Sequence, residues 1–294
     1  MRLKPGDIFD EFEVIRHIGS GAFAEVYLAQ DTILERIVVL KQLSPQLSED
    51  DREWAAFVNE AQVTASFFHP GIITVHGLRV DAKANSAILV LEYMDGGTLR
   101  DLIELDGALD LELIWKLAYQ VGDALSYLHT RGVLHRDIKP ENILYSKETG
   151  WFKLTDFGLA YHPKRPEFEE LNQGQPGTLI YMSPEQTRNQ AELVSERADL
   201  YGFATILHES LTGRYYLPID PLHSDPIDIS DCIQNEDMLP LPSVHAEDVL
   251  VSQLEEVLRK ALAKHPLRRY PNVRRFVRAF TRVIENMQAT MTEH

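Results

Sequence analysis

Residues 1–94 are dominated by short runs in which apolar and polar positions alternate, the pattern of half-buried strands. Residues 12–16 and 24–28 alternate in this way, whereas residues 36–41 are apolar and β-branched, as in a buried strand. Two further strands are expected at residues 72–76 and 87–91. The sequence therefore predicts a small sheet in the first third of the chain.

One helix is expected within this strand-rich region. Ser48 stands three positions before Asp51, which is the spacing of a helix capping box. Proline cannot continue a helix, so Pro70 marks an end. We predict a helix from Ser48 to about His69–Pro70, followed by the last two strands and then a break at Asp95-Gly96-Gly97.

Beyond this break the apolar residues recur every three or four positions, which is typical of helices. The first long helix is predicted from Ile114, Leu117, Ala118, Val121, Leu125 and Leu128. Ser195 can cap a helix that ends at Gly213, Ser252 and Glu255 have capping-box spacing, and Asn272 can cap a last helix. Its inward face would be Val273, Phe276, Val277, Phe280, Val283 and Ile284. The pattern assigns no element to residues 215–245.

These elements predict an α+β fold of two lobes. Residues 1–94 would form a small β-rich lobe with one main helix, and residues 95–294 a larger, mainly helical lobe. The chain of 294 residues has an ordinary hydrophobic content of 44%, enough for a core of normal size. Nothing in the pattern suggests repeats or low-complexity segments.

Charge and cysteine content narrow the range of partners. The net charge of −16 repels nucleic acids and anionic lipids, so we expect no nucleic-acid partner. The single cysteine, Cys232, allows no internal disulfide and is expected to be a small structural residue, which suits a reducing cytoplasm. No apolar run has the length of a membrane span, and the scattered histidines predict no structural zinc.

A glycine-rich segment and a lysine–glutamate spacing suggest a phosphate site in the first lobe. Residues 19–26 read Gly-Ser-Gly-Ala-Phe-Ala-Glu-Val and lie between two predicted strands, where glycine lets backbone amides approach phosphates. A hairpin turn explains this segment equally well. Lys41 ends a predicted strand and Glu60 follows on the predicted helix, so the two could pair; the alternative for Lys41 is an ordinary surface lysine.

The strongest chemical signal lies in the second lobe. Residues 135–142 read His-Arg-Asp-Ile-Lys-Pro-Glu-Asn, and Asp156-Phe157-Gly158 follows. An aspartate, a lysine, an asparagine and a second aspartate can orient a hydroxyl, neutralise a phosphate in transfer and hold Mg²⁺. Phosphoryl transfer from ATP needs this positioning and charge stabilisation more than covalent help.

Taken together, these motifs resemble the protein kinase family over nearly the whole chain. The resemblance includes the glycine-rich loop, Lys41, Glu60, the segment 135–142, Asp156-Phe157-Gly158 and Ser183-Pro184-Glu185. Residues 177–186 and 260–270 look most like the bacterial serine/threonine kinases. The resemblance implies an ATP- and Mg²⁺-dependent kinase that phosphorylates serine and threonine in protein substrates, with Mn²⁺ as an alternative metal.

The resemblance also implies a role for each matching residue. Asp137 would orient the substrate hydroxyl, Lys139 would contact the γ-phosphate, and Thr178 would support both. Lys41, paired with Glu60, would hold the α- and β-phosphates. The implied metal ligands are Asn142 and Asp156. The implied nucleotide contacts are Gly19, Ser20, Gly21, Ala22, Phe23, Val26, Val39, Leu91, Glu92, Met94 and Leu144.

Further residues would have structural roles by the same resemblance. Glu185 and Arg269 would form a buried ion pair, Asp199 would brace the catalytic loop, and His135 would be packed rather than act as a base. Three positions depart from the family pattern. Ala24 and Ala204 stand where the family usually has glycine, and Val39 stands where it usually has alanine. No departure removes a charged catalytic group.

Several alternatives stay open at this point. The chain could be a pseudokinase that binds without turnover, or a small-molecule kinase of the aminoglycoside type. A homodimer and a membrane tether outside this chain are also compatible with the sequence. Arg274, Arg275, Arg278 and Arg282 line one side of the last helix, either as a solvated face or as a docking site for an acidic partner.

The expected activation loop has an unusual composition. Residues 159–177 contain no serine or threonine, so the usual phosphorylation that would pair with Arg136 has no acceptor near Thr178. We hypothesise that Glu169 or Glu170 pairs with Arg136 permanently. The alternative is that both glutamates are solvated and a partner or substrate orders the loop.

Overall fold

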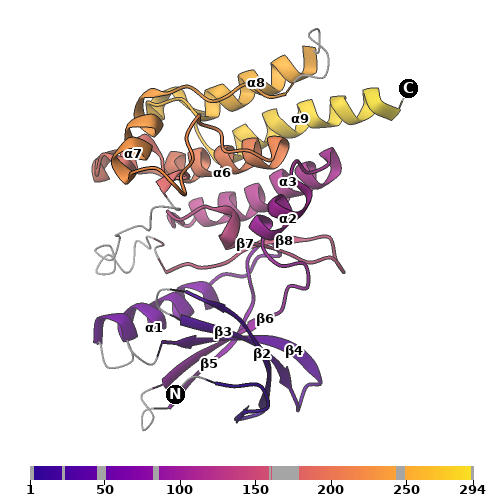
Figure 1. Cartoon of the computed structure of the whole chain (residues 1–294), viewed down its shortest axis with the longest axis vertical. Coiled ribbons are helices and arrows are strands. Elements are labelled where there is room, and N and C mark those ends of the chain that lie inside the picture. Colours follow the sequence, from indigo (N-terminus) through magenta and orange to yellow (C-terminus); the bar gives the residue numbers. More distant parts are fainter. Residues whose placement is uncertain are drawn as a thin grey trace. The chain divides into compact units, whose positions relative to one another are not determined.

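The computed structural model describes residues 3–21, 24–44, 51–81, 86–158, 160, 179–242 and 249–292. The chain divides into two compact units. The first comprises Met1–Asp95 with Asp156–Gly158, and the second comprises Gly96–Thr155 with Leu159–His294. The sheet lies in the first unit and most helices lie in the second (Figure 1).

The first unit is built on a six-stranded antiparallel sheet in the order β1-β2-β3-β4-β6-β5. The strands are β1 Ile8–Phe9, β2 Phe12–Ser20, β3 Ala24–Asp31, β4 Arg36–Leu43, β5 Val75–Asp81 and β6 Ser86–Glu92. Four of the five predicted strands are confirmed. The strand predicted at residues 72–76 is wrong in position, because β5 begins only at Val75, where its pairing with β6 starts, and the buried residues Ile72 and Ile73 precede it.

Helix α1, Asp51–Ala65, is confirmed as the helix of this unit, but it ends earlier than predicted. After Ala65, the backbone amides of Ser66 and Phe67 bond to the carbonyl oxygens of Val63 and Thr64, three residues back. Such bonds tighten and terminate the last turn, so Pro70 is not what stops the helix. Ser48, the predicted cap, lies outside the described residues.

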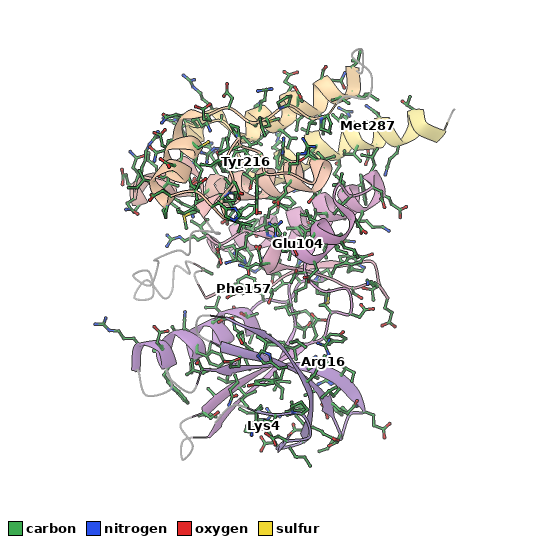
Figure 2. All side chains as sticks on the ribbon, in the orientation of Figure 1. Lys4, Arg16, Glu104, Phe157, Tyr216 and Met287 are labelled. Carbon is green, nitrogen blue, oxygen red and sulfur yellow. The ribbon has the colours of Figure 1, made fainter. Side chains whose placement is uncertain are left out.

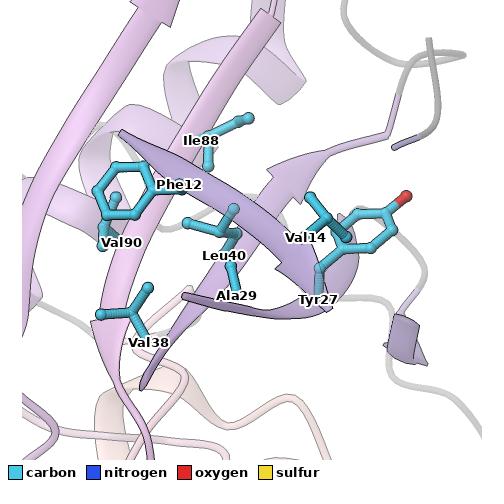
Figure 3. Close-up of a cluster of buried hydrophobic side chains, with 8 residues drawn as sticks. All are labelled: Phe12, Val14, Tyr27, Ala29, Val38, Leu40, Ile88 and Val90. Carbon is cyan, nitrogen blue, oxygen red and sulfur yellow. The ribbon is translucent and has the colours of Figure 1, made fainter. Parts of the chain in front are cut away.

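One face of the sheet carries a compact apolar core. Its members alternate along four strands: Phe12 and Val14, Tyr27 and Ala29, Val38 and Leu40, Ile88 and Val90 (Figure 3). The register brings them together, since Tyr27 lies opposite Leu40 and Leu40 opposite Val90. Because side chains on a strand alternate between faces, the intervening residues Val39 and Lys41 lie on the other face.

The second unit is mainly helical. Its α-helices are α2 Leu99–Asp106, α3 Leu111–His129, α5 Pro184–Thr187, α6 Glu196–Thr212, α7 Pro226–Asn235, α8 Val249–Ala261 and α9 Val273–Thr292. The 3₁₀ turns η1 Pro140–Asn142, η3 Ala191–Leu193 and η4 Pro266–Arg268 and the hairpin of β7 Ile143–Tyr145 with β8 Phe152–Leu154 complete the described elements. Helix α9 packs against α3 and α8 (Figure 1).

Two predicted caps are confirmed in this unit. Ser195 Oγ accepts a hydrogen bond from the Arg197 amide, and α6 ends at Gly213 in the left-handed conformation, with φ of 66°. Asn272 Oδ1 accepts a hydrogen bond from the Arg275 amide at 3.0 Å, at the start of α9. Local sequence signals therefore set the ends of α6 and the start of α9.

Three features of the helical unit differ from the prediction. Ser252 and Glu255 lie inside α8, which already begins by Val249, so they form no capping box there; Glu255 Oε1 instead accepts a hydrogen bond from the Leu241 amide at 2.7 Å. Residues 215–245, to which the sequence pattern assigned no element, contain α7, which is capped by Asp225. Helix α2 was not predicted, although Thr98 and Asp101 form a capping box at its start.

Candidate functional site

In the first unit, Lys41 lies between two carboxylates on the face of the sheet opposite the core. Its Nζ atom is 2.5 Å from Glu60 Oε1, supplied by α1, and 3.6 Å from Asp156 Oδ1. Burial alone would lower the pKa of the Lys41 ammonium, but the charges of Asp156 and Glu60 outweigh burial and raise this pKa. Lys41 therefore carries a fixed positive charge at any physiological pH.

The segment around Asp156 is anchored by the phenylalanine that follows it. Phe157, labelled in Figure 2, is fully buried. Its ring lies 5.3 Å from the ring of Phe67, just beyond the end of α1. Asp156 itself has a positive φ of 61°, which is strained for a residue other than glycine. The buried ring and the strained backbone together fix where the Asp156 carboxylate is presented.

The glycine-rich segment forms the end of the β2–β3 hairpin. Gly19 and Ser20 belong to β2, opposite Val26 and Glu25, and the Gly21 amide bonds to the Ala24 carbonyl oxygen at 2.8 Å. A Cβ atom at Gly19 would meet no atom within 4 Å, so packing within the described residues does not account for this glycine. Ala22 and Phe23 lie outside the described residues.

The Ser20 hydroxyl is already engaged within this hairpin. Ser20 Oγ donates to Glu25 Oε2 at 2.7 Å, and His17 Nε2 lies 2.9 Å from the same oxygen. Glu25 is buried, and these hydrogen bonds help to satisfy its carboxylate. A phosphate contact at Ser20 would therefore come from its backbone amide, as predicted for this loop, rather than from its hydroxyl.

Three predicted adenine contacts of the first unit, Val26, Val39 and Leu91, share the sheet face that carries Lys41. Val26 lies opposite Lys41 on the neighbouring strand, and Val39 lies opposite Leu91. Val26 and Val39 are half-buried, whereas Leu91 and Met94 are buried. The backbone amide of Glu92 donates to the Thr74 carbonyl oxygen at 3.0 Å, so a hydrogen bond from Glu92 to adenine can involve only its carbonyl group.

In the second unit, the structure brings Asp137, Lys139 and Asn142 together around η1. Asp137 Oδ2 accepts from Asn142 Nδ2 at 2.9 Å and lies 2.8 Å from Lys139 Nζ. Asp137 Oδ1 is buried and has no hydrogen-bond partner among the described residues. One carboxylate oxygen is thus used to position the side chain, while the other makes no hydrogen bond to a described residue.

Asp199 holds the backbone that leads to Asp137. Its carboxylate accepts hydrogen bonds from the amides of His135 and Arg136 at 2.9 and 2.8 Å, and His129 Nε2 lies 2.7 Å away. Burial would raise the pKa of Asp199, but the hydrogen bond and charge of His129, with the charge and backbone amide of His135, outweigh burial and lower this pKa. Arg136 has a φ of 65°, and Asp199 stabilises this strained conformation.

His135 has the structural role expected of it. It is fully buried, and its Nε2 atom lies 3.2 Å from the Thr155 carbonyl oxygen. The predicted ion pair of Glu185 and Arg269 is also formed. Thr178, Glu169 and Glu170 lie outside the described residues, so the support predicted for Asp137 and the pairing predicted for Arg136 stay predictions.

The donor atoms of Asn142 and Asp156 suit a hard divalent cation. Asn142 uses its Nδ2 group on Asp137, and its amide oxygen accepts no hydrogen bond from a described residue. Carboxylate and amide oxygens are the ligands that Mg²⁺ prefers, with water and phosphate oxygens completing its shell. Among the described residues, no group of three or more histidine, cysteine or carboxylate side chains could hold a metal by itself.

A charged network that the sequence analysis did not predict surrounds Arg100 and includes Glu141, the residue before Asn142. Arg100 Nη1 donates to Glu209 Oε1 at 2.8 Å and Arg100 Nε to Glu141 Oε1 at 3.0 Å, while the Tyr181 hydroxyl donates to Glu209 Oε2 at 2.6 Å. These residues come from α2, η1, α6 and the segment before α5. Glu141 and Tyr181 lie in segments that resemble kinase motifs, but no local spacing links either of them to Arg100 or Glu209.

Comparisons with known proteins agree with this arrangement. The chain matches the protein kinase domain family over residues 12–278. It is 35% identical to serine/threonine-protein kinase PknB of Mycobacterium leprae over 269 residues, which covers 90% of this chain and 42% of that protein. It is 34% identical to serine/threonine-protein kinase PrkC of Bacillus subtilis over 264 residues, which covers 90% of this chain and 39% of that protein.

A solved structure supports the fold. The kinase domain of PknI from Mycobacterium tuberculosis is similar with a TM-score of 0.67 and 28% identity, covering 97% of this chain and all of that one. The predicted two-lobed fold, with a β-rich first lobe and a helical second lobe, is thereby confirmed. The chain spans less than half the length of the curated relatives described above.

Proposed function

Because the chain belongs to the protein kinase family, we propose that it transfers the γ-phosphoryl group of ATP to serine and threonine hydroxyls of protein substrates. The observation that carries this proposal is the environment of Asp137. One of its carboxylate oxygens is held by Lys139 and Asn142, and the other has no partner among the described residues. A buried acceptor of this kind is what a substrate hydroxyl requires.

In the proposed reaction, the substrate hydroxyl oxygen attacks the γ-phosphorus while Asp137 orients the hydroxyl and accepts its proton. The bond between the γ-phosphorus and the bridging oxygen breaks, and ADP leaves. Lys139 stabilises the charge on the γ-phosphate, and Lys41, fixed by Glu60, binds the α- and β-phosphates. Positioning and charge stabilisation supply most of the rate acceleration.

Asn142 and Asp156 are the residues that would hold the metal. When bound, Mg²⁺ neutralises charge on the phosphate oxygens, and Mn²⁺ accepts the same oxygen ligands. By the family resemblance, the adenine contacts would be Val26, Val39, Leu91, Met94, the Glu92 carbonyl and Leu144. The glycine-rich segment from Gly19 would bind phosphate through backbone amides.

Two observations support a preference for serine and threonine over tyrosine. One is Lys139, and the other is that the relatives described above are named serine/threonine-protein kinases. We place the reaction in the cytoplasm, where ATP is available and Cys232 stays reduced. None of the helices in the described part of the chain combines the length and hydropathy that a membrane span requires. The net charge of −16 argues against a nucleic-acid partner.

The pseudokinase alternative is disfavoured by the retention of every charged group. Loss of turnover in a kinase fold normally follows loss of the lysine, the catalytic aspartate or the metal ligand, and Lys41, Asp137 and Asp156 are all present. The spare oxygen of Asp137 has no structural use among the described residues, because its partner oxygen already makes the local contacts.

The test is transfer of radiolabelled phosphate from ATP to serine/threonine peptides and to matched tyrosine peptides. Asp137→Asn should slow transfer by roughly 10²–10⁴-fold, which is the rate acceleration that a positioned general base usually contributes. Asp106→Asn removes an exposed carboxylate at the end of α2 and serves as the control, with unchanged rate. Equal rates for Asp137→Asn and the parent protein, or labelling confined to tyrosine, would contradict the proposal.

A further inference from the structure

Four arginines on α9 form an unusual surface in this acidic protein. Arg274, Arg275, Arg278 and Arg282 are all exposed, and we call them the α9 arginine surface. Among the described residues, none of their side chains makes a hydrogen bond or an ion pair. The chain has 45 acidic residues against 29 basic ones, so unpaired arginines gathered on one helix stand out against the net charge of −16.

These arginines do not stabilise the helix that carries them. Arg274 and Arg275 lie in the first turn of α9, where the helix dipole favours negative charge. Arg278 follows Arg274 by four residues and Arg282 follows Arg278 by four, and like charges at this spacing repel. The inner face of α9 is fully packed by residues such as Phe276 and Phe280, so the arginines are not needed for burial either.

The outer part of this surface borders a hollow of about 450 Å³. Arg278, Thr281, Arg282 and Glu285 line it. Glu285, the one acidic member, is held from α3, because Trp115 Nε1 donates to its Oε1 at 2.9 Å. Trp115 in turn stacks on Tyr119 with ring centroids 5.1 Å apart and planes inclined by 7°. The hollow thus has two unpaired guanidinium groups and one carboxylate that already has a partner.

We propose that the α9 arginine surface and its hollow bind an acidic segment of a protein partner. Carboxylates of such a segment match the planar donors of Arg278 and Arg282, which can form two parallel hydrogen bonds each. Arg274 and Arg275, one to two turns earlier on the helix, would contact further carboxylates along an extended segment. Tyr119, a residue that is 51% exposed and stacks on Trp115, offers a further apolar contact on α3.

Charge distribution favours a short protein segment over an anionic membrane. A flat anionic surface meets a large part of the molecule, and the overall charge of −16 opposes that approach. A short acidic segment interacts mainly with charges within about 8 Å at physiological salt. It therefore feels the four arginines and little of the remaining negative charge. The same argument disfavours nucleic acid, whose charge density extends far beyond the patch.

The test measures binding directly, so it does not depend on catalysis. Fluorescence anisotropy follows a short labelled peptide rich in glutamate, and a matched peptide with glutamine at every glutamate position. The full chain should bind the glutamate peptide and not the glutamine peptide. Binding should weaken as NaCl is raised from about 0.05 to 0.5 M, which shortens the screening length.

Paired variants locate the site. Arg278→Gln/Arg282→Gln should weaken binding of the glutamate peptide by about tenfold or more, equivalent to about 1.4 kcal/mol. The control Arg16→Gln/Arg214→Gln removes the same charge from exposed arginines in β2 and after α6, and should bind like the parent (Figure 2 labels Arg16). Both variants should keep the phosphorylation rate of a neutral peptide, which shows that they are folded.

Three results would overturn the proposal. The first is equal weakening by both variants, which would mean that only net charge matters. The second is binding of the glutamine peptide as tightly as the glutamate peptide. The third is failure of the glutamate peptide to bind while phosphatidylglycerol-containing vesicles capture the parent and not the Arg278→Gln/Arg282→Gln variant. Each of these results is independent of whether the protein transfers phosphate.

Discussion

Arg269 and Glu185 form a two-pronged ion pair that is almost completely removed from solvent. Nη1 lies 2.7 Å from Oε1 and Nη2 lies 2.8 Å from Oε2, with side-chain exposures of 0% and 1%. Arg269 also bonds to the carbonyl oxygens of Ala263, Arg197 and Lys264. It therefore joins the segment before α9 to the start of α6 and to α5.

Removing one member of this pair should be strongly destabilising. Arg269→Met leaves Glu185 as a buried, uncompensated charge, which typically costs about 3–5 kcal/mol. Urea unfolding should show this loss in the free energy of unfolding. The exposed neighbour Arg268 supplies the control, since Arg268→Gln should change that free energy by less than about 0.5 kcal/mol. Equal effects of the two substitutions would contradict the structural role of the pair.

Binding of Mg-ATP should stabilise the folded chain. A ligand at about 100 times its dissociation constant adds roughly 2.7 kcal/mol to stability, which a thermal melt detects as a higher Tm. Asp156→Asn should reduce this rise, because the proposed metal ligand loses its charge. Asp106→Asn should leave the rise unchanged. An identical Tm with and without saturating Mg-ATP in the parent protein would favour the pseudokinase alternative.

Helices α3 and α9 approach so closely at Gly122 that a methyl group does not fit. A Cβ atom there would lie 2.3 Å from Val277 Cγ2. Helix propensity alone would make Gly122→Ala stabilising by about 0.8–1.0 kcal/mol, but overpacking typically costs about 1–3 kcal/mol. We expect Gly122→Ala to lower the free energy of unfolding measured in urea.

A second substitution tests whether Val277 is the cause. Val277→Ala removes the methyl groups that would clash, so the double variant should be more stable than the sum of the two single effects predicts. If the two effects simply add, the clash with Val277 is not what makes Gly122 necessary.

His208 should make stability depend on pH in the mildly acidic range. Burial lowers the pKa of His208 from its ordinary value of 6.5, although hydrogen bonds with the backbone of Leu239 and Arg214 oppose this. The folded state then binds fewer protons than the unfolded state below pH 6.5, so this contribution is complete above pH 6.5 and is lost as pH falls towards the folded-state pKa.

The measurement is Tm as a function of pH for the parent and for His208→Gln. Glutamine does not titrate and can still donate to the Leu239 carbonyl oxygen, which lies 2.9 Å from His208 Nε2. The variant should therefore lose less stability than the parent between about pH 7 and pH 5. Parallel curves for the two proteins would show that His208 does not contribute.

The sequence by itself determined most helices and strands of this protein and predicted which residues carry its chemistry. The alternation in β2, β3, β4 and β6 and the three-to-four spacing in α3 and α9 are local patterns that burial requires. Caps such as Ser195, Gly213 and Asn272 act on neighbouring backbone groups, so they too can be read locally. The motif residues Lys41, Glu60, Asp137, Asn142 and Asp156 were identified in the same way, although their roles stay predictions.

Only the tertiary structure decided how distant residues share one environment. The Arg100 side chain meets Glu209 across 109 positions of sequence, and Trp115 meets Glu285 across 170. Ser252 and Glu255 have the spacing of a cap, yet they lie within α8, where Glu255 binds the Leu241 amide. A local pattern reports what a segment can form by itself. Partners far away in sequence determine which of those options satisfies buried charges and backbone groups.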